Sequence, residues 1–242
     1  MKIIVPLAGK DPRYETINVY KPFIDIHGKP LIHHVLSANQ FPFENMHFII
    51  LNEHEEKYQV TKHLKNHFGS DAMVYIIEKE TEGSPETILQ IENVVNGDED
   101  ILIELGDVVR DLLDFEKDIK KNSQYAGILP IDPEFTAEKW GYVKRKGTEV
   151  LEMCEKSLEV IIGGATMGLY YFKHGKDFVR YAKQMINKQI KIPPLELYYV
   201  APIYNEYIND KKKVGISNAK ILSVLGSPEQ IDAYLNAMQY NR

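Results

Sequence analysis

Two cationic side chains follow a small-residue turn near the N-terminus. The apolar run 1–7 leads into Ala8 and Gly9, and Arg13 and Lys21 lie in the polar stretch that follows. A glycine at the end of a strand lets backbone N–H groups approach an anion closely, and fixed cations beside it add attraction. This arrangement suits the phosphates of a nucleoside triphosphate.

A carboxylate follows another apolar run in the same way. Residues 101–105 end at Gly106 and Asp107. Mg²⁺ prefers oxygen ligands and substrate phosphates to a closed protein cage, so Asp107 is a candidate metal ligand. The alternative is that Asp107 caps a helix covering residues 111–119. The denser acidic group 98–100 precedes the strand and is interpreted as a solvated turn.

Alternating strands and helices position these residues. Short apolar runs predict strands at 1–7, 46–51, 73–77 and 101–105, with helices at 29–40, 54–68 and 83–95 between them. Such alternation predicts an α/β fold with a mixed, mostly parallel sheet and helices on both faces, so Gly9 and Asp107 share one sheet edge.

The second half of the chain changes character. Short turns separate predicted strands at 125–131, 142–146, 149–155, 166–172, 212–216 and 219–224, which favours an antiparallel or mixed extension. Further helices are predicted at 174–186, 197–210 and 227–239. The tyrosine-rich segment 198–207 is interpreted as packing, with Tyr204 and Asn205 as candidates to reach a cleft. We expect one domain over 1–242, with a nucleotide-binding half to about 125 and an acceptor-binding half after it.

Composition limits the kind of partner. The 242 residues carry 29 basic and 35 acidic side chains, and this net charge of -6 disfavours a nucleic-acid binder. Cys154 is the only cysteine, which excludes an intrachain disulfide. The sequence lacks a signal-peptide pattern and an apolar run of the roughly 20 residues that a membrane helix needs. We expect a cytoplasmic protein without a membrane partner, and a homodimer remains open.

The N-terminal pattern resembles the signature of nucleotidylyltransferases that join NTPs to phosphorylated sugars or small alcohols. Leu7-Ala8-Gly9, Arg13, Lys21-Pro22 and Gly28-Lys29-Pro30 match that signature in type and spacing. Two departures stand out. Asp11-Pro12 replaces the usual small pair and puts a carboxylate beside the expected triphosphate, and Tyr20 stands where proline is common.

The resemblance implies a role for each matched residue. Arg13 and Lys21 would be catalytic, and Asp107 would hold Mg²⁺ as the cofactor. The expected nucleotide contacts come from the two strand ends and from the segment 78–87, where Ser84-Pro85 could equally be a simple helix cap; they are Leu7, Ala8, Gly9, Glu80, Gly83 and Gly106.

Three segments of the second half repeat the order of the family's acceptor-binding segments. These are Trp140-Gly141, Glu155-Lys156 and the glycine-containing strand that begins near Thr166. The resemblance implies that Gly141, Glu155, Lys156 and Thr166 bind the acceptor. Residues 163–186 and 198–210 look like a branch found among capsule and surface-polysaccharide enzymes.

One expected carboxylate is missing. The family commonly has a second metal ligand just before a glycine-threonine-proline-glutamate turn, and here Val224 occupies that position before Gly226-Ser227-Pro228-Glu229. Asp107, the triphosphate and waters would then hold the metal, which Mg²⁺ tolerates; otherwise activity is reduced or lost.

The sequence therefore predicts an Mg²⁺-dependent nucleotidylyltransferase that transfers a nucleotide to a small phosphorylated acceptor and releases pyrophosphate. The capsule-type resemblance favours CTP over UTP or dTTP, without fixing the base or the acceptor. Two alternatives remain open. A glycosyltransferase of similar fold normally needs a paired-carboxylate metal site, whereas a non-catalytic nucleotide sensor is suggested by Val224 and Asp11.

Overall fold

Parallel strands form the first half of the central sheet. This computed structural model describes residues 1–39, 41–157, 159 and 161–240. Neighbouring strands run in the order β6-β1-β4-β5, and all three pairings are parallel. Their bounds are β1 (Lys2–Pro6), β4 (Met46–Leu51), β5 (Met73–Ile77) and β6 (Ile101–Glu104). The four predicted strands are present, because near-continuous apolar runs suit strands covered on both faces.

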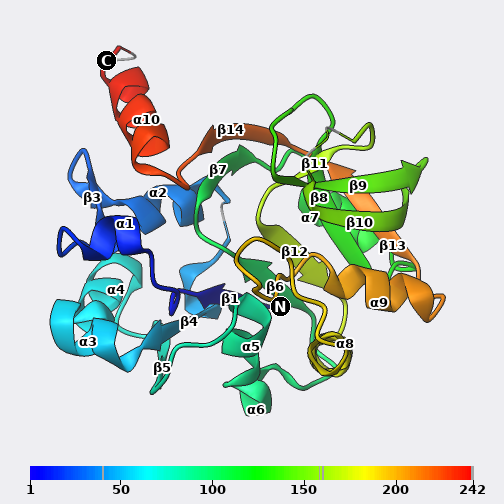
Figure 1. Cartoon of the computed structure of the whole chain (residues 1–242), viewed down its shortest axis with the longest axis horizontal. Coiled ribbons are helices and arrows are strands. Elements are labelled where there is room, and N and C mark those ends of the chain that lie inside the picture. The colour runs from blue at the N-terminus through cyan, green and yellow to red at the C-terminus, as the bar shows by residue number, and fades with distance from the viewer. Residues whose placement is uncertain (40, 158, 160, 241–242) are drawn as a thin grey trace.

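The second half extends this sheet mainly with antiparallel strands. β12 lies antiparallel between β6 and β8, β13 runs parallel to β8, and β10, β9 and β11 complete a ten-stranded sheet. The bounds are β8 (Gly127–Asp132), β9 (Trp140–Lys146), β10 (Glu149–Ser157), β11 (Ala165–Thr166), β12 (Leu169–Phe172) and β13 (Val214–Asn218). The fold is the expected mixed α/β class, with its parallel part in the first half (Figure 1).

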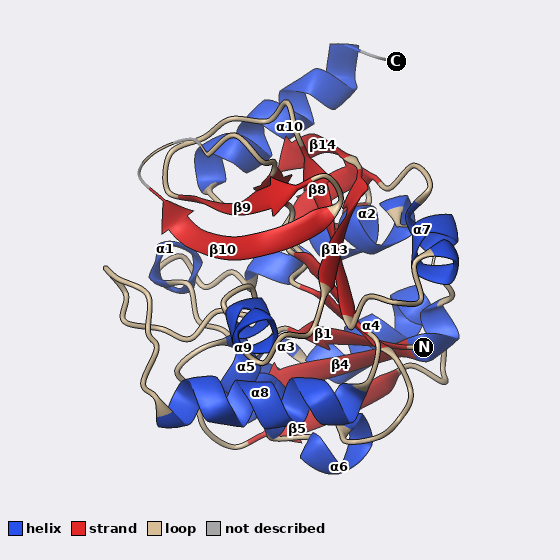
Figure 2. Cartoon of the chain, turned by 90° about the vertical axis from the view of Figure 1, so that its right-hand side faces the viewer, coloured by secondary structure: helices blue, strands red, loops and turns tan. Residues whose placement is uncertain are grey.

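Helices cover both faces of the sheet (Figure 2). Along β1, Ile3 and Val5 join the core under one set of helices, whereas Ile4 joins the core under the other. The Ile3 face packs on α2 (Leu31–Ala38), α4 (Val60–Phe68) and α7 (Phe115–Lys121). The Ile4 face packs on α5 (Ser84–Leu89), α6 (Glu92–Val95), α8 (Gly175–Asn187) and α9 (Ile203–Asn209). Among the described residues, none of these helices is long and apolar enough to cross a membrane.

Several predicted helices are shorter or broken. The helix predicted at 54–68 is two helices, α3 (Asn52–Tyr58) and α4, because Gln59 adopts a left-handed conformation with φ of 50°. The helix predicted at 83–95 splits into α5 and α6, and that at 197–210 begins only at Ile203. The predicted helix 29–40 contains α2, preceded by a hairpin of β2 (Asp25–Ile26) and β3 (Lys29–Pro30), and Gln40 lies outside the described residues.

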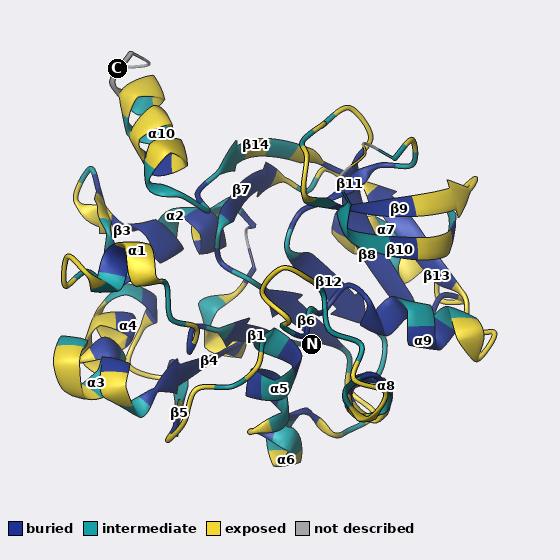
Figure 3. Ribbon diagram, in the orientation of Figure 1, coloured by how far each residue is buried: buried dark blue, intermediate teal, exposed yellow. Residues whose placement is uncertain are grey.

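The predicted start of the helix at 111–119 was wrong. Residues after Asp107 form β7 (Val108–Asp111), which pairs antiparallel with β14 (Lys220–Val224), and α7 begins only at Phe115. A strand forms here because the C-terminal segment supplies its partner. β14 leads into α10 (Pro228–Tyr240), which projects from the body and is exposed over much of its surface (Figure 3).

Gly83 joins the two halves of the chain. It forms an isolated parallel bridge with Tyr198, and Tyr198 N donates to the carbonyl of Glu82 at 2.8 Å. Gly83 has a φ of 130°, and a Cβ there would lie 2.1 Å from the carbonyl oxygen of Tyr198. Only glycine fits both the backbone conformation and this close approach.

We expect Gly83→Ala to lower the free energy of unfolding by about 2–3 kcal/mol, because the added Cβ forces the Tyr198 backbone away. Urea unfolding followed by far-UV circular dichroism measures the change. Gly97→Ala is the matched control, since the nearest atom to its added Cβ is 4.0 Å away. Equal stability of the two variants would contradict the contact.

Candidate active site

A cleft of about 420 Å³ opens at the carboxyl edge of the parallel strands. Its walls come from the loop after β1, the turn after β6, the strands β9 and β10, and the turn before α10. Seven predicted site residues line it together: Arg13, Lys21, Asp107, Gly141, Glu155, Lys156 and Thr166. Residues from both halves of the chain therefore meet at one cavity.

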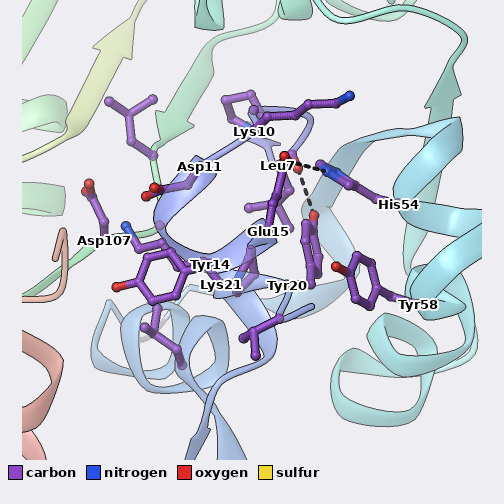
Figure 4. A pocket seen from close by; sticks show the side chains of 17 residues that line it. Leu7, Lys10, Asp11, Tyr14, Glu15, Tyr20, Lys21, His54, Tyr58 and Asp107 are labelled. Carbon is purple, nitrogen blue, oxygen red and sulfur yellow. Dashed lines mark hydrogen bonds and ion pairs between the residues drawn. The ribbon is translucent and has the colours of Figure 1, made fainter. Parts of the chain in front are cut away.

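A smaller cavity of about 220 Å³ adjoins this cleft at Lys21 and Asp107. The loop of residues 9–22 arches over it, and the predicted nucleotide residues Leu7, Gly9 and Gly106 line it (Figure 4). Gly9 is exposed, and a Cβ there would meet nothing within 4 Å, so its backbone has open space beside it. The predicted residues Ala8, Glu80 and Gly83 lie outside both cavities.

Asp107 is held close to two glycines at the centre of the cleft. Its Oδ1 would be 3.5 Å from a Cβ at Gly168, and its Oδ2 would be 4.0 Å from a Cβ at Gly226. The backbone also fixes this position, because Leu225 N donates to the carbonyl of Asp107 at 2.7 Å. The predicted metal ligand thus lies on a strand connection braced by the C-terminal segment, and not at a helix cap.

A buried ion pair lies behind Asp107. Glu104 and Arg110 both have fully buried side chains and are hydrogen-bonded to each other. Glu104 also accepts from Gly106 N at 2.8 Å and from Asn39 Nδ2 at 2.6 Å. The pair closes the turn that carries Gly106 and Asp107. Sequence patterns did not indicate this network, because Asn39 lies 65 residues before Glu104 and because the strand that carries Arg110 depends on its pairing with β14.

A short helix presents Arg13. Asp11 caps α1 (Pro12–Glu15) by accepting from Arg13 N, and Pro12 occupies its first position. Arg13 Nη2 donates to the carbonyl of Gly226 at 2.8 Å, and Lys21 Nζ reaches the same oxygen at 3.5 Å. The unusual Asp11-Pro12 pair therefore builds the helix that brings Arg13 into the cleft.

The second departure from the signature pattern, Tyr20, fixes the far side of the loop. Its hydroxyl donates to the carbonyl of Leu7 at 2.7 Å, and its ring stacks on Tyr58 and contacts His54. Burial lowers the pKa of His54, with the nearby carboxylate of Glu15 opposing that shift. In Figure 4 this aromatic group lies on the opposite side of the loop from Asp11 and Asp107.

A β-bulge aims the acceptor-side residues. The register of β10 against β9 shifts between Cys154 and Ser157, and Lys156 has a left-handed φ of 52°. Bulges re-aim side chains in this way, and here both Glu155 and Lys156 line the cleft. Lys156 Nζ lies 5.4 Å from the centre of the Tyr199 ring, within cation–π range.

Gly141 leaves room for its neighbours in this part of the cleft. A Cβ at Gly141 would lie 2.5 Å from Thr166 Oγ1 and 3.0 Å from Glu155 Oε2. Trp140 Nε1 donates to the carbonyl of Thr166 at 2.6 Å. Burial in the cleft raises the pKa of the Glu155 carboxyl, and the charge of Lys156 opposes that rise. A hydrogen-bond donor or a cation on a ligand would stabilise the charged form of this carboxylate.

Comparison with known proteins identifies the family. The model of the nucleotidyl transferase family matches residues 16–193, nearly three-quarters of the chain. The chain belongs to this family. It is also similar to "Bifunctional protein GlmU" of Buchnera aphidicola, with 21% identity over 93% of this chain and 50% of the relative. The chain spans about half or less of the length of the curated relatives it matches.

Solved structures show the same fold at low identity. A nucleoside-diphosphate-sugar pyrophosphorylase from Vibrio cholerae RC9 aligns with a TM-score of 0.77 and 20% identity, covering 97% of this chain and 99% of that one. The inositol-1-phosphate CTP transferase from T. maritima aligns with a TM-score of 0.70 and 12% identity, covering 98% and 94%. These likenesses establish the architecture of the family member described here.

Several cleft residues of this family member were not predicted. Ser84 lines the cleft and does not cap α5, whose N-cap is Gly83 without a side-chain hydrogen bond. Tyr199 reaches the cleft, whereas Tyr204 is fully buried and Asn205 binds the backbone of Met153. The tyrosine-rich composition signalled this segment, but only the bend before α9 decides which ring faces the cleft.

The donor set fits Mg²⁺ with one protein carboxylate. Asp107 faces the cleft, and Val224 also lines it at the position where the family commonly has an aspartate. The described residues contain no group of three His, Cys, Asp or Glu side chains placed to hold a metal ion. Mg²⁺ accepts such a site when substrate phosphates and waters supply the remaining oxygens.

We expect Arg110→Met to lower the free energy of unfolding by about 3–5 kcal/mol, because the Glu104 carboxylate stays buried without its partner. Adding Glu104→Gln should recover at least about 1 kcal/mol, since it removes the buried charge while the amide oxygen can still accept from Gly106 N. Urea unfolding at pH 7.5 measures both. If the single variant loses under about 1 kcal/mol, the ion pair does not brace the turn.

Proposed function

We propose that the chain transfers a nucleoside monophosphate from an NTP to a small phosphorylated acceptor. The observation that carries this proposal is the single cleft lined by Arg13, Lys21 and Asp107 from one half and by Glu155 and Lys156 from the other. A phosphate oxygen of the acceptor attacks the α-phosphorus of the NTP. The bond from the α-phosphorus to the bridging oxygen breaks, and pyrophosphate leaves with that oxygen.

No protein nucleophile is needed for this reaction, so catalysis consists of positioning and charge neutralisation. Arg13 binds the β- and γ-phosphates, and Lys21 stabilises the charge that develops on the α-phosphoryl group. Asp107 holds Mg²⁺, which when bound neutralises phosphate charge. Leu7, Ala8, Gly9 and Gly106 approach the nucleotide with their backbone, and Glu80 and Gly83 contribute to selection of the base.

The acceptor occupies the part of the cleft between β9 and β10. Lys156 binds its phosphate, and Glu155 accepts from a hydroxyl or amine. Gly141 and Thr166 complete the wall, with the Thr166 hydroxyl donating to the carbonyl of Gly141 at 3.2 Å. This charge pattern supports a small phosphomonoester that carries a hydrogen-bond donor, such as a sugar phosphate.

We favour a pyrimidine nucleotide, with CTP ahead of UTP and dTTP. The capsule-type resemblance of residues 163–186 and 198–210 supports CTP and a role in surface-polysaccharide synthesis. Structural neighbours include an inositol-1-phosphate CTP transferase and a UDP-glucose pyrophosphorylase. The single carboxylate Asp107 argues against a glycosyltransferase, which normally uses a carboxylate pair.

Pyrophosphate release tests the proposal directly. Purified protein is incubated with Mg²⁺, each NTP in turn and a panel of phosphorylated sugars and small alcohols. We expect release that requires both the NTP and one acceptor class, with CTP the best donor. Transfer of sugar from a nucleotide sugar without pyrophosphate would identify a glycosyltransferase, and nucleotide binding without turnover would identify a sensor.

We expect Lys21→Ala to lower kcat by roughly 10²- to 10³-fold, because the ammonium is used mainly as charge develops in the transition state. Lys183→Ala is the matched control, since Lys183 of α8 pairs with Glu92 of α6 and lies outside the cleft. Steady-state kinetics with saturating NTP compare the two. Unchanged kcat in Lys21→Ala would remove this residue from the mechanism.

We expect weak binding of Mg²⁺ alone, because Asp107 is the only protein carboxylate assigned to the metal. Metal and NTP should then raise each other's affinity by the same factor. Titration calorimetry with Mg²⁺, NTP and both measures this coupling. Tight binding of Mg²⁺ without nucleotide would mean that another carboxylate completes the site.

Val224→Asp supplies the missing carboxylate and should make binding of Mg²⁺ alone detectable in the same titration. Leu222→Asp changes the charge equally on the same strand, but Leu222 is exposed and does not line the cleft. A gain with both variants would indicate a general charge effect.

A further inference from the structure

The Asp11 carboxylate engages the cation that the proposed function assigns to phosphate. Asp11 Oδ1 accepts from the backbone N and from Nε of Arg13, at 3.1 and 2.9 Å, and Oδ2 accepts from Nη2 at 2.7 Å. The hydrogen bonds and charge of Arg13 hold the pKa of Asp11 below its usual range, and the charge of Lys21 adds to this effect. An internal anion therefore acts on Arg13 and Lys21, the two cations that the proposed function uses.

A count of donors shows what remains for a ligand. A guanidinium has five N–H donors, one on Nε and two on each Nη nitrogen. Asp11 accepts from Nε and Nη2, and the carbonyl of Gly226 accepts a second hydrogen bond from Nη2. Within the part of the chain that the structure describes, no hydrogen bond is made by Nη1. Asp11 therefore occupies the edge formed by Nε and Nη2, one of the two edges that can bind a phosphate with two parallel hydrogen bonds, and on the other edge, Nη1 with Nη2, the carbonyl of Gly226 already accepts from Nη2.

The pair also stands where phosphates would enter. Arg13 and Lys21 line the larger cleft, Asp11 lines the smaller cavity, and Lys21 and Asp107 line both. About half of the Arg13 side chain and a quarter of the Asp11 side chain are exposed, so the pair is open to solvent and to an incoming anion. Such a pair is weak enough for a polyphosphate to displace.

We propose that Asp11 is an internal competitor of the nucleotide phosphates for Arg13, and so sets the affinity for nucleotide and pyrophosphate. This inference rests on the proposed role of Arg13. When a polyphosphate binds, Arg13 turns its occupied edge from Asp11 to the phosphate, and the side-chain hydrogen bonds between Asp11 and Arg13 are lost. Affinity is thereby reduced, and product pyrophosphate leaves more readily.

The alternative is that Asp11 only shapes the loop, because it also caps α1. The two roles have opposite signs. Removing a competitor tightens anion binding, whereas removing a scaffold weakens it. Asparagine keeps the capping oxygen without the charge, and serine keeps a capping hydroxyl with a shorter side chain, so both variants preserve the helix start.

The test uses titration calorimetry of the full chain with Mg²⁺ and inorganic pyrophosphate. We expect Asp11→Asn and Asp11→Ser to lower the Kd for pyrophosphate by about two- to fivefold, the range that exposed ion pairs generally give. Asp98→Asn is the control, because it removes the same charge at a distant position. Asp98 lies on the turn before β6, pairs with Lys176 of α8 and lines neither cavity. Unchanged or weaker pyrophosphate binding in both Asp11 variants overturns the inference.

A double-variant comparison tests whether Asp11 affects pyrophosphate binding through Arg13. In the Arg13→Ala background, Asp11→Asn should change the Kd for pyrophosphate by less than a factor of about 1.5, within the additivity expected of uncoupled changes. An undiminished gain in that background would mean simple charge repulsion and would also overturn the inference. Pyrophosphate binding is measured without turnover, so this test does not depend on the transferase reaction. If Asp11→Asn tightens pyrophosphate binding but the protein never releases pyrophosphate from an NTP, the proposed transferase function is wrong and the competing role of Asp11 still holds.

Discussion

The buried ion pair of Glu104 and Arg110 is the interaction on which the site depends. Both side chains are fully buried, and burial of two charges is costly unless each remaining donor and acceptor is used. Glu104 meets this condition by accepting from Arg110, Asn39 and the backbone of Gly106, whereas Nε of Arg110 has no hydrogen-bond partner among the described residues. The network ties the end of β6, the strand β7 and the C-terminal cap of α2 into one arrangement. Asp107 lies on the turn that this arrangement holds.

The charges of the cleft are balanced around the backbone of the C-terminal turn. The carbonyl of Gly226 accepts from Arg13 and Lys21, while Leu225 N donates to the backbone carbonyl of Asp107. The same turn therefore contacts both of the cations that the proposed function assigns to phosphate and the residue that it assigns to the metal. Together with the Asp11–Arg13 pair, the Gly226 carbonyl stabilises the cationic loop without a bound anion.

Local patterns predicted the framework and the location of many candidate residues. Apolar runs predicted each strand of the parallel half. Strands β1, β4 and β6 are covered on both faces, so their composition alone identifies them, whereas the edge strand β5 is partly exposed although its sequence is equally apolar. The order strand, small-residue turn and cations predicted that Arg13, Lys21 and Asp107 would meet at one edge, and they line one cleft. Helix bounds were less predictable, as at Gln59, where a single left-handed residue breaks a continuous helical pattern.

The sequence by itself determined the alternation of elements, the fold class and the edge of the sheet where polar residues gather, because these follow from local periodicity and from the direction of parallel strands. Only the tertiary structure decided how the site is braced. β7 is a strand because β14 pairs with it, Lys156 enters the cleft through a bulge, and Tyr199 faces the ligand side while Tyr204 is buried. Each of these depends on contacts between residues distant in sequence, and such contacts leave no periodic signal.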